Sequence, residues 1–359
     1  MTDATRAGRT LAVVSSLLVA CEAEVSPQWW EGDFIRYATS RDLHACAGTP
    51  VVADQFVPFI AGELDIELPP RLDYEWLSSA EYAQRDLCSG PSTGCSSGTQ
   101  AYALDPLLLH ELVHGVTGAS GMNRAPFFTE GLAVAYDPLT RFMESRYVAE
   151  FPDGLDDPRP ELTRPAGMVS YQTAGGFVSF LLTRYGPEKV VEISRMSRGG
   201  DGLAVIRANF RVVFGAELDT EAELYMRSDS LGCDTHVFDV RPQDCTMPEV
   251  AWSGDQWVHA GIMDCEDDTV AGGVGATMWR SVTLEVPTAG RYLVRTFGEG
   301  GRVRLGRCFG CPWEHDDVLL YGSSLPEAVA TLEAGTYFVR MEARADDAPL
   351  VGVAVSPVD

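Results

Sequence analysis

The sequence predicts two structural classes in one chain, an α+β domain followed by an all-β sandwich. Apolar residues recur at helical spacing in the first part, most clearly over Tyr171–Tyr185. From about Trp252 the pattern changes to short alternating segments such as Val282–Val286, separated by turns that contain glycine. We therefore expect a signal segment at 1–20, an α+β domain at 21–250 and a β-sandwich at 251–359.

Within the first domain, short aromatic and β-branched runs predict strands, and longer periodic segments predict helices. Ser96–Ala103 is expected to be an edge strand that leads into the next helix. Arg141–Pro165, which is rich in Pro and Asp, predicts a loop or cap. Strands or strand ends are expected at Trp29–Tyr37, Ile66–Leu68 and Tyr74–Tyr82. The other expected elements are strands at Val282–Val286, Tyr292–Arg295, Val303–Leu305, Val318–Tyr321 and Tyr337–Ala343, and helices at Val51–Ala61, Gly131–Tyr136, Tyr171–Tyr185, Glu188–Met196, Leu203–Phe214 and Thr220–Met226.

The segment His110–His114, with the sequence HELVH, carries the strongest chemical signal in the chain. On a helix, positions i and i+4 share one face, so both imidazoles can bind a single zinc ion. Glu111 lies beside them, where it can act as a base toward a water on that metal. Pro106 suits the first turn of this helix. A buried histidine pair without a metal is the alternative.

A third metal ligand is expected from the next helix, because a catalytic zinc usually takes three protein ligands and keeps one position for water. Glu130 follows His114 after fifteen intervening residues. It is expected near a helix start, with Thr129 as the N-cap, and from there it can reach the metal. The alternative is a glutamate placed to interact with the helix dipole.

HELVH followed by FTEGLAVAY resembles the gluzincin metallopeptidases, in which a Glu of the second helix completes the zinc site. The resemblance implies a thermolysin-like compact catalytic domain, a small mixed sheet plus helices, with His110, His114 and Glu130 holding one Zn²⁺. It also implies that Glu111 takes a proton from zinc-bound water and that an extended peptide pairs along the edge strand. Val134 departs from the family, since thermolysin-like enzymes often carry an Asp four residues after the ligand Glu. The carboxylate behind the zinc histidines must therefore come from elsewhere.

Tyr171 opens the following predicted helix, and several small residues come after it. Compact gluzincins often carry a Tyr at such a helix start, where its hydroxyl points at the developing oxyanion. The resemblance implies this catalytic role for Tyr171, because a phenol donor stabilises charge that forms in the transition state. The alternative is an aromatic side chain that only packs at the start of the helix.

The N-terminal residues predict export. Arg6 and Arg9 precede an apolar run, Thr10–Ala20, that is too short to span a bilayer and is typical of a signal peptide. Leu18–Cys21 resembles a bacterial lipobox, which implies that its cysteine is lipidated and anchors the mature protein in a membrane. Glu22 after that cysteine favours the outer membrane. An ordinary secretory signal, giving a periplasmic or secreted protein, is the alternative.

Eight cysteines remain after the lipobox cysteine, and an even set in an oxidising compartment predicts disulfides. Sequence does not fix their pairing, and Cys233 with Cys245 is the pair expected first. Cys308 and Cys311 form a C-x-x-C motif. A zinc knuckle is the alternative for these two residues, although no second C-x-x-C accompanies them.

The formal net charge of −25 excludes nucleic acid as a partner, because a phosphate backbone would be repelled. The expected partners are a peptide or protein substrate and, through lipid on Cys21, a membrane. Two sandwich segments, VPTAGRYLVRT and LEAGTYFVRM, resemble accessory domains C-terminal to bacterial secreted peptidases, some of which bind Ca²⁺. The acidic residues that could bind Ca²⁺, with solvated acidic loops as the alternative, are Asp264, Glu266, Asp267, Asp268, Glu314, Asp316 and Asp317.

Together these features predict zinc-dependent peptide-bond hydrolysis by a lipid-anchored, exported metallopeptidase of the cell envelope. Two other functions remain open. One is a surface-binding or adhesion lipoprotein whose peptidase-like domain binds zinc without turnover, and the other is a non-peptidase zinc hydrolase on the same scaffold. An intact Glu111 favours the enzyme, because metal binding alone does not need the base.

Overall fold

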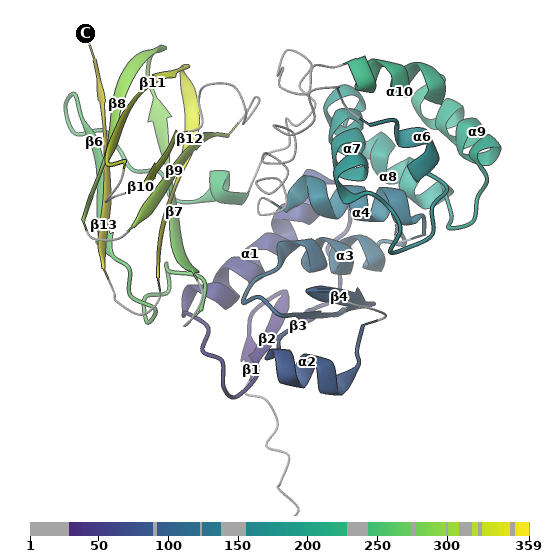
Figure 1. The fold of residues 1–359 in the computed structure, drawn as a ribbon, viewed down its shortest axis with the longest axis horizontal. Coiled ribbons are helices and arrows are strands. Elements are labelled where there is room, and N and C mark those ends of the chain that lie inside the picture. Colours follow the sequence, from purple (N-terminus) through teal and green to yellow (C-terminus); the bar gives the residue numbers. More distant parts are fainter. Residues whose placement is uncertain are drawn as a thin grey trace, which may run out of the picture.

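Two buried cores organise the chain, one in a mixed α/β module and one in a β-sandwich (Figure 1). The predicted mixture of helices and sheets is confirmed at this level. The predicted signal segment 1–20 lies outside the described residues. The computed structural model describes residues 29–88, 92–122, 124–137, 156–227, 243–273, 277–298, 301–308, 318–321, 325–344 and 349–358.

The N-terminal module (described residues 29–227) contains a five-stranded sheet in the order β1-β2-β3-β5-β4. Its three central strands are parallel, and the two outer strands pair antiparallel. The single edge strand predicted at Ser96–Ala103 is wrong in detail. The chain turns at Gly98, which has a φ of 61°, and the predicted segment is split between β4 and β5. Of these two strands, only β4 lies at the edge of the sheet. The strands are β1 (Trp29–Glu31), β2 (Ile35–Thr39), β3 (Leu72–Trp76), β4 (Gly94–Ser97) and β5 (Gln100–Ala103).

Two other strand predictions in this module are wrong. The strand predicted over Tyr74–Tyr82 ends at Trp76, and α2 (Ser79–Arg85) follows because the Ser78 side chain accepts the backbone N–H of Glu81 as an N-cap. Ile66–Leu68 is neither helix nor strand. It runs into Pro69 and Pro70, which cannot donate hydrogen bonds to a sheet.

The helices of the N-terminal module pack around α3, which contacts β4, β5, α1 and α4. The helices predicted at Tyr171–Tyr185 and Leu203–Phe214 are confirmed with these bounds. Within the predicted loop Arg141–Pro165, the described part contains one short helix. The helices besides α2 are α1 (Gly48–Glu63), α3 (Leu109–Ala119), α4 (Pro126–Tyr136), α6 (Pro158–Glu161), α7 (Tyr171–Tyr185), α8 (Pro187–Met196), α9 (Leu203–Phe214) and α10 (Leu218–Arg227).

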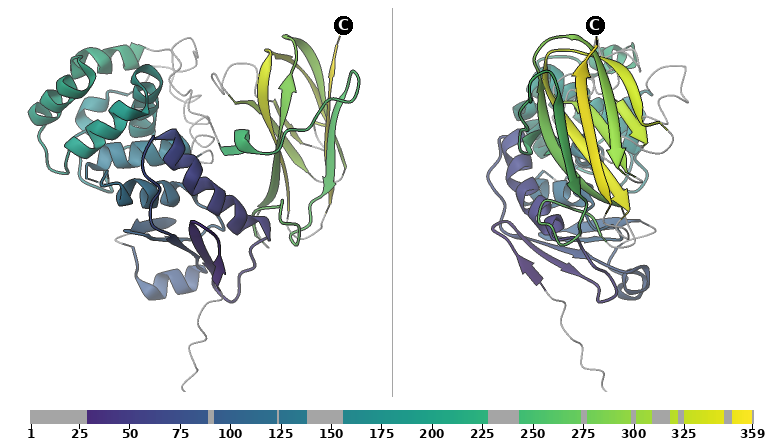
Figure 2. Two further views of the ribbon diagram at one scale, coloured as in Figure 1. Left: turned by 180° about the vertical axis from the view of Figure 1, so that it is seen from behind. Right: turned by 90° about the vertical axis from the view of Figure 1, so that its left-hand side faces the viewer.

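The sandwich consists of two four-stranded antiparallel sheets that face each other (Figure 2). Their orders are β10-β9-β12-β7 and β11-β8-β13-β6, and each strand segment predicted here lies within an observed strand. A short 3₁₀ helix, η2 (Gln243–Thr246), packs on β7 and β12. The strands are β6 (Trp257–Ile262), β7 (Thr277–Val286), β8 (Gly290–Gly298), β9 (Arg302–Arg307), β10 (Val318–Tyr321), β11 (Glu327–Leu332), β12 (Gly335–Arg344) and β13 (Leu350–Pro357).

Disulfides join Cys46 to Cys265, Cys88 to Cys95 and Cys245 to Cys308. The expected pairing of Cys233 with Cys245 is therefore wrong, and the Cys308 thiolate is not available to a zinc knuckle. Cys233 and Cys311 lie outside the described residues. The bonds indicate an oxidising, extracytoplasmic compartment. None of the helices that the structure describes has both the length and the apolar character needed to cross a membrane.

The start of α1 joins the two modules. Ala47, at its N-cap position, offers no side-chain cap, so the first backbone N–H groups need other acceptors. The sandwich supplies them: the N–H of Ala47 donates to the Cys265 carbonyl at 2.8 Å, and that of Gly48 donates to Val270 at 3.0 Å. The Thr49 hydroxyl donates to the Gly272 carbonyl at 2.6 Å. The helix end is thus capped by the other module.

Candidate metal centre

Helix α3 places His110 and His114 one turn apart, and both side chains are buried. The helix begins at Leu109, so the prediction that Pro106 lies in its first turn is wrong. The Pro106 carbonyl instead accepts the Tyr37 hydroxyl at 2.6 Å. The backbone N–H before the helix, that of Leu108, donates to the Tyr74 hydroxyl at 2.7 Å. Buried tyrosines of β2 and β3 therefore hold the segment that leads into α3.

Helix α4 carries Glu130. The helix begins one turn earlier than predicted, because Pro126 suits the first helical position. Thr129 is therefore not the N-cap, and its hydroxyl donates to the Ala125 carbonyl within the helix at 3.0 Å. Glu130 lies in the second turn, where it is too far along the helix for the dipole alternative to explain its position.

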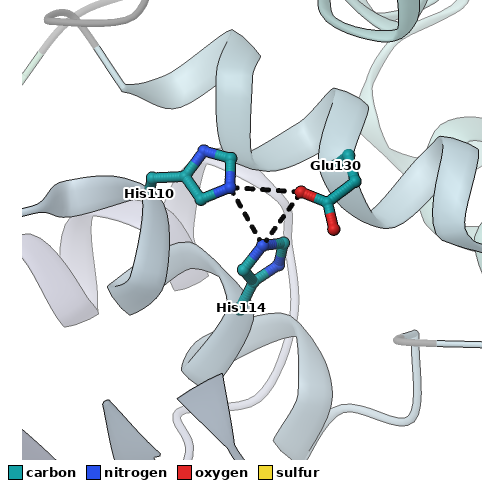
Figure 3. Close-up of side chains that lie close together, drawn as sticks. All are labelled: His110, His114 and Glu130. Carbon is teal, nitrogen blue, oxygen red and sulfur yellow. Dashed lines mark hydrogen bonds and ion pairs between the residues drawn. The ribbon is translucent and has the colours of Figure 1, made fainter. Parts of the chain in front are cut away.

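The three predicted ligands converge (Figure 3). The two Nε2 atoms of His110 and His114 are 3.1 Å apart, and Glu130 Oε2 lies 3.2 Å from the first and 3.3 Å from the second. A tetrahedral ion with bonds of about 2.1 Å separates neighbouring ligand atoms by about 3.4 Å, so this triangle has the size that zinc requires. Two imidazole nitrogens and a carboxylate oxygen also fit the donor preference of zinc.

Glu130 and the two imidazoles shift one another's pKa values. Burial raises the pKa of Glu130, but hydrogen bonds from both imidazoles lower it more, and the net shift is well below the usual range. Burial lowers the pKa of His110, and the hydrogen bond to Glu130 with the charges of Glu111 and Asp137 outweighs this and raises it. The carboxylate is thus held ionised, the form that binds a metal.

Glu111 is buried beside the cluster, and burial raises the pKa of its carboxyl group. It also lies against the edge strand: a Cβ atom built on Gly94 of β4 would be 2.9 Å from the Glu111 Cγ. A larger residue at position 94 would displace this side chain. Gly94 therefore allows β4 and the carboxylate to approach closely.

Tyr171 is the first residue of α7, after Ser170 as the N-cap. Its ring stacks on that of His110, with centroids 5.4 Å apart and planes inclined by 26°. The side chain is about half exposed. Burial, the nearby carboxylates and a hydrogen bond with Glu130 raise its pKa, so the hydroxyl keeps its proton at neutral pH. The structure thus brings the protonated hydroxyl of Tyr171 to the three predicted ligands.

The close packing of α4 on α7 fixes the distance between Glu130 and Tyr171. Gly131 faces α7, and a Cβ atom there would be 2.7 Å from the Ala174 carbonyl oxygen. Only glycine allows the two helix backbones to approach this closely.

Sequence reasoning missed Asp137, a fully buried carboxylate at the end of α4. It follows Glu130 by seven residues, or two helical turns, so it lies on the same face. Its negative charge raises the pKa of His110 and that of Glu111. Asp137 is therefore a candidate for the carboxylate that Val134 does not supply. The signal available in the sequence was this helical spacing.

The predicted calcium ligands show other contacts where they are described. Asp267 accepts the backbone N–H and hydroxyl of Thr269 and pairs with Arg280. Asp264 accepts the backbone N–H of Glu266 at 3.0 Å. Among the described residues, the His-His-Glu group is the one metal-ligand cluster that assembles. The other three predicted ligands, Glu314, Asp316 and Asp317, lie outside these residues, and calcium binding stays a prediction.

The fold and this cluster define a mixed α/β module with a candidate metal centre, joined to a β-sandwich. No family model and no curated protein matches the sequence. Among solved structures, PliG from Aeromonas hydrophila, a periplasmic inhibitor of g-type lysozyme, is 12% identical with a TM-score of 0.21, covering 31% of this chain and 94% of that one. The pre-peptidase C-terminal domain of a collagenase from Bacillus anthracis is 13% identical with a TM-score of 0.21, covering 31% and 92%. Similarities this low assign neither a family nor a function.

Proposed function

We propose that this chain is an exported, zinc-dependent metallopeptidase of the gluzincin type, with a thermolysin-like compact catalytic domain. The observation that carries the proposal is the ligand triangle of His110, His114 and Glu130, with separations of 3.1–3.3 Å. A structural zinc site is normally closed by four protein ligands, whereas three ligands leave a position for water. The proposed site is thus of the catalytic kind.

Zinc bound there would polarise a peptide carbonyl and lower the pKa of a water molecule. Glu111 then accepts a proton from the attacking water and passes it to the leaving amine, a role that suits a buried carboxylate with a raised pKa. The Tyr171 hydroxyl donates a hydrogen bond to the carbonyl oxygen as negative charge develops on it. The negative charge of Asp137 stabilises positive charge on His110.

The proposed substrate is a peptide or protein in extended form. Such a chain would add to the exposed edge of β4, whose Gly94 lies against Glu111. Disulfides place the protein in an oxidising compartment. We further propose that lipid on Cys21 anchors the protein, with the outer membrane favoured.

The test is Glu111→Gln, which keeps the size of the side chain but removes its ability to accept a proton. Hydrolysis of a mixed peptide library should fall by about 10²–10⁴-fold while zinc content stays at the wild-type level. Glu75→Gln is the matched control, because Glu75 is a buried glutamate of the same module that pairs with Arg85. If wild type and Glu111→Gln are equally inert on the library, a zinc-binding adhesion lipoprotein becomes the better explanation.

A further inference from the structure

A cavity of about 560 Å³ lies between the N-terminal module and the sandwich. Residues of α1, of the segment that leads into α3, of η2 and of β7 line it. Its volume is in the range of small-molecule sites, which often lie between domains. The walls are held together by the Cys46–Cys265 disulfide and by a hydrogen bond of 3.0 Å from Gln243 Nε2 to the Val52 carbonyl. The apolar lining residues are Val51, Val52, Leu107, Leu109, Met247, Pro248, Val250, Ala271, Trp279 and Val282.

One of the lining residues, Arg340 of β12, is a buried guanidinium that is 6% exposed. Within the described residues its Nε has no hydrogen-bond acceptor, and Asp244 Oδ2 lies 3.7 Å from its Nη1. Glu342 Oε1 is 3.4 Å from Nε without hydrogen-bond geometry, and the Trp279 ring lies 4.4 Å below the guanidinium. Both carboxylates serve other partners, since Glu342 pairs with Arg302 and Asp244 accepts the hydroxyl of a serine.

Two more polar atoms of the lining residues lack partners. Among the described residues, Arg280 Nε and His259 Nε2 are buried without a hydrogen-bond partner. Arg280 uses its Nη2 for Asp267. Burial and the positive charge of Arg280 lower the pKa of His259, so this imidazole is neutral at neutral pH. These three nitrogen atoms are themselves enclosed, so a molecule in the cavity would meet Arg340 through its Nη atoms, for which the described residues offer no hydrogen bond and only Asp244 Oδ2 at 3.7 Å from Nη1.

The charges around Arg340 decide what kind of acceptor fits. Arg340 and Arg302 balance Asp244 and Glu342, so this cluster needs no further negative charge. A carboxylate beside Arg340 would be repelled by the two acidic side chains. An uncharged carbonyl oxygen accepts a hydrogen bond without that repulsion, and the apolar walls suit a hydrocarbon body.

We propose that this cavity binds an uncharged, apolar molecule that carries an amide or ester carbonyl, with Arg340 as the principal donor. The site does not depend on the proposed metal chemistry, because none of its lining residues is a ligand of the metal cluster. Occupancy would satisfy Arg340 and bury an apolar surface at the junction of the two modules.

The experiment uses the mature chain and two probes, 4-phenylbutanamide and its charged isostere 4-phenylbutanoate, in ligand-observed NMR titrations up to about 10 mM, the affinity range of small probes. The amide should bind at least fivefold more tightly than the carboxylate. Arg340→Met should weaken amide binding at least fivefold. Arg295→Met is the matched control, because Arg295 is an exposed arginine of the same sandwich that pairs with Glu327 and does not line the cavity, and it should stay within twofold.

A second variant tests the cavity without touching Arg340. Val51→Phe fills part of the space from α1 and should weaken amide binding at least fivefold, whereas Val205→Phe on an exposed face of α9 should not change it. Equal or tighter binding of the carboxylate would overturn the proposed ligand class. Absence of amide binding to the wild type, or full binding to a folded Arg340→Met protein or to Val51→Phe, would overturn the site itself.

Discussion

The His110–His114–Glu130 group in the N-terminal module and the Arg340 cluster at the module junction are both buried and polar, but the spacing of their polar atoms differs. In the first, three ligand atoms lie 3.1–3.3 Å apart and hydrogen-bond to one another. In the second, Arg340 lies 3.4–3.7 Å from carboxylates that serve other partners. Converging atoms leave room for one small ion, whereas donors spread around a 560 Å³ cavity leave room for a molecule. The spacing of buried polar atoms thus indicates the size of the ligand.

The largest expected effect is loss of the metal from the first cluster. His110→Ala with His114→Ala removes two of three ligands, so zinc content should fall from about one per chain to none. His44→Ala is the control, since His44 is an exposed histidine of the same module, and it should keep its zinc. Metal analysis by mass spectrometry checks this. If the double variant still binds one zinc per chain, His110 and His114 are not the metal ligands, and the proposed metal site is wrong.

The second largest effect concerns Tyr171 and tests whether the first cluster is catalytic. Tyr171→Phe keeps the ring that stacks on His110 but removes the hydroxyl. If this donor is used mainly in the transition state, turnover should fall about a hundredfold, or about 3 kcal/mol, with little change in KM. Tyr185→Phe, at the other end of α7, is the control. Turnover within twofold of wild type, with only a shift in Tm, would assign Tyr171 to packing.

The third largest effect concerns the disulfide that links the two modules near the Arg340 cluster, and it tests how much this bond contributes to the free energy of unfolding. Cys46→Ser with Cys265→Ser opens a link between residues 219 apart in sequence and should destabilise the protein by about 2–4 kcal/mol. Opening the Cys88–Cys95 link, with a separation of 7, should cost roughly half as much, because the constrained loop is short. Denaturant unfolding of the two variants compares them. Equal losses would show that the long-range link stabilises the junction no more than closing a short loop does.

The convergence of His110, His114 and Glu130 could be predicted because the three residues lie close together in the sequence. His110 and His114 are four residues apart on one helix, and Glu130 is on the next helix. The HELVH motif and the helix after it therefore identified the three residues that the structure brings together. Asp137 was missed because the family pattern places the second carboxylate four residues after the ligand Glu, where this chain has Val134, whereas Asp137 follows Glu130 by seven residues.

The junction could not be predicted, because its parts are distant in sequence. Arg340, Asp244 and Trp279 meet through the register of β12 with β7 and the packing of η2. The partner of Cys245 is settled by that same packing, which places Cys308 beside it. Alternating apolar residues predicted the strands of the sandwich well, but alternation does not say which strands become neighbours.

The smallest expected effect concerns the acid sensitivity of the junction, where Asp267 pairs with the cavity-lining Arg280. Hydrogen bonds from the Thr269 hydroxyl and backbone N–H, with the charge of Arg280, lower the pKa of Asp267 in the folded protein. A carboxyl group with a lowered folded pKa stabilises the fold above its unfolded pKa, about 3.9, and this contribution is lost as the pH falls through the folded value. Asp267→Asn should therefore lower Tm slightly at pH 7 and reduce the loss of Tm as the pH falls below about 4. Asp268→Asn makes the same charge change at the next residue and is the control. If Asp267→Asn loses as much Tm in acid as the wild type does, the Asp267–Arg280 pair does not stabilise the junction. The junction would then differ further from the His110–His114–Glu130 group, whose members hydrogen-bond to one another.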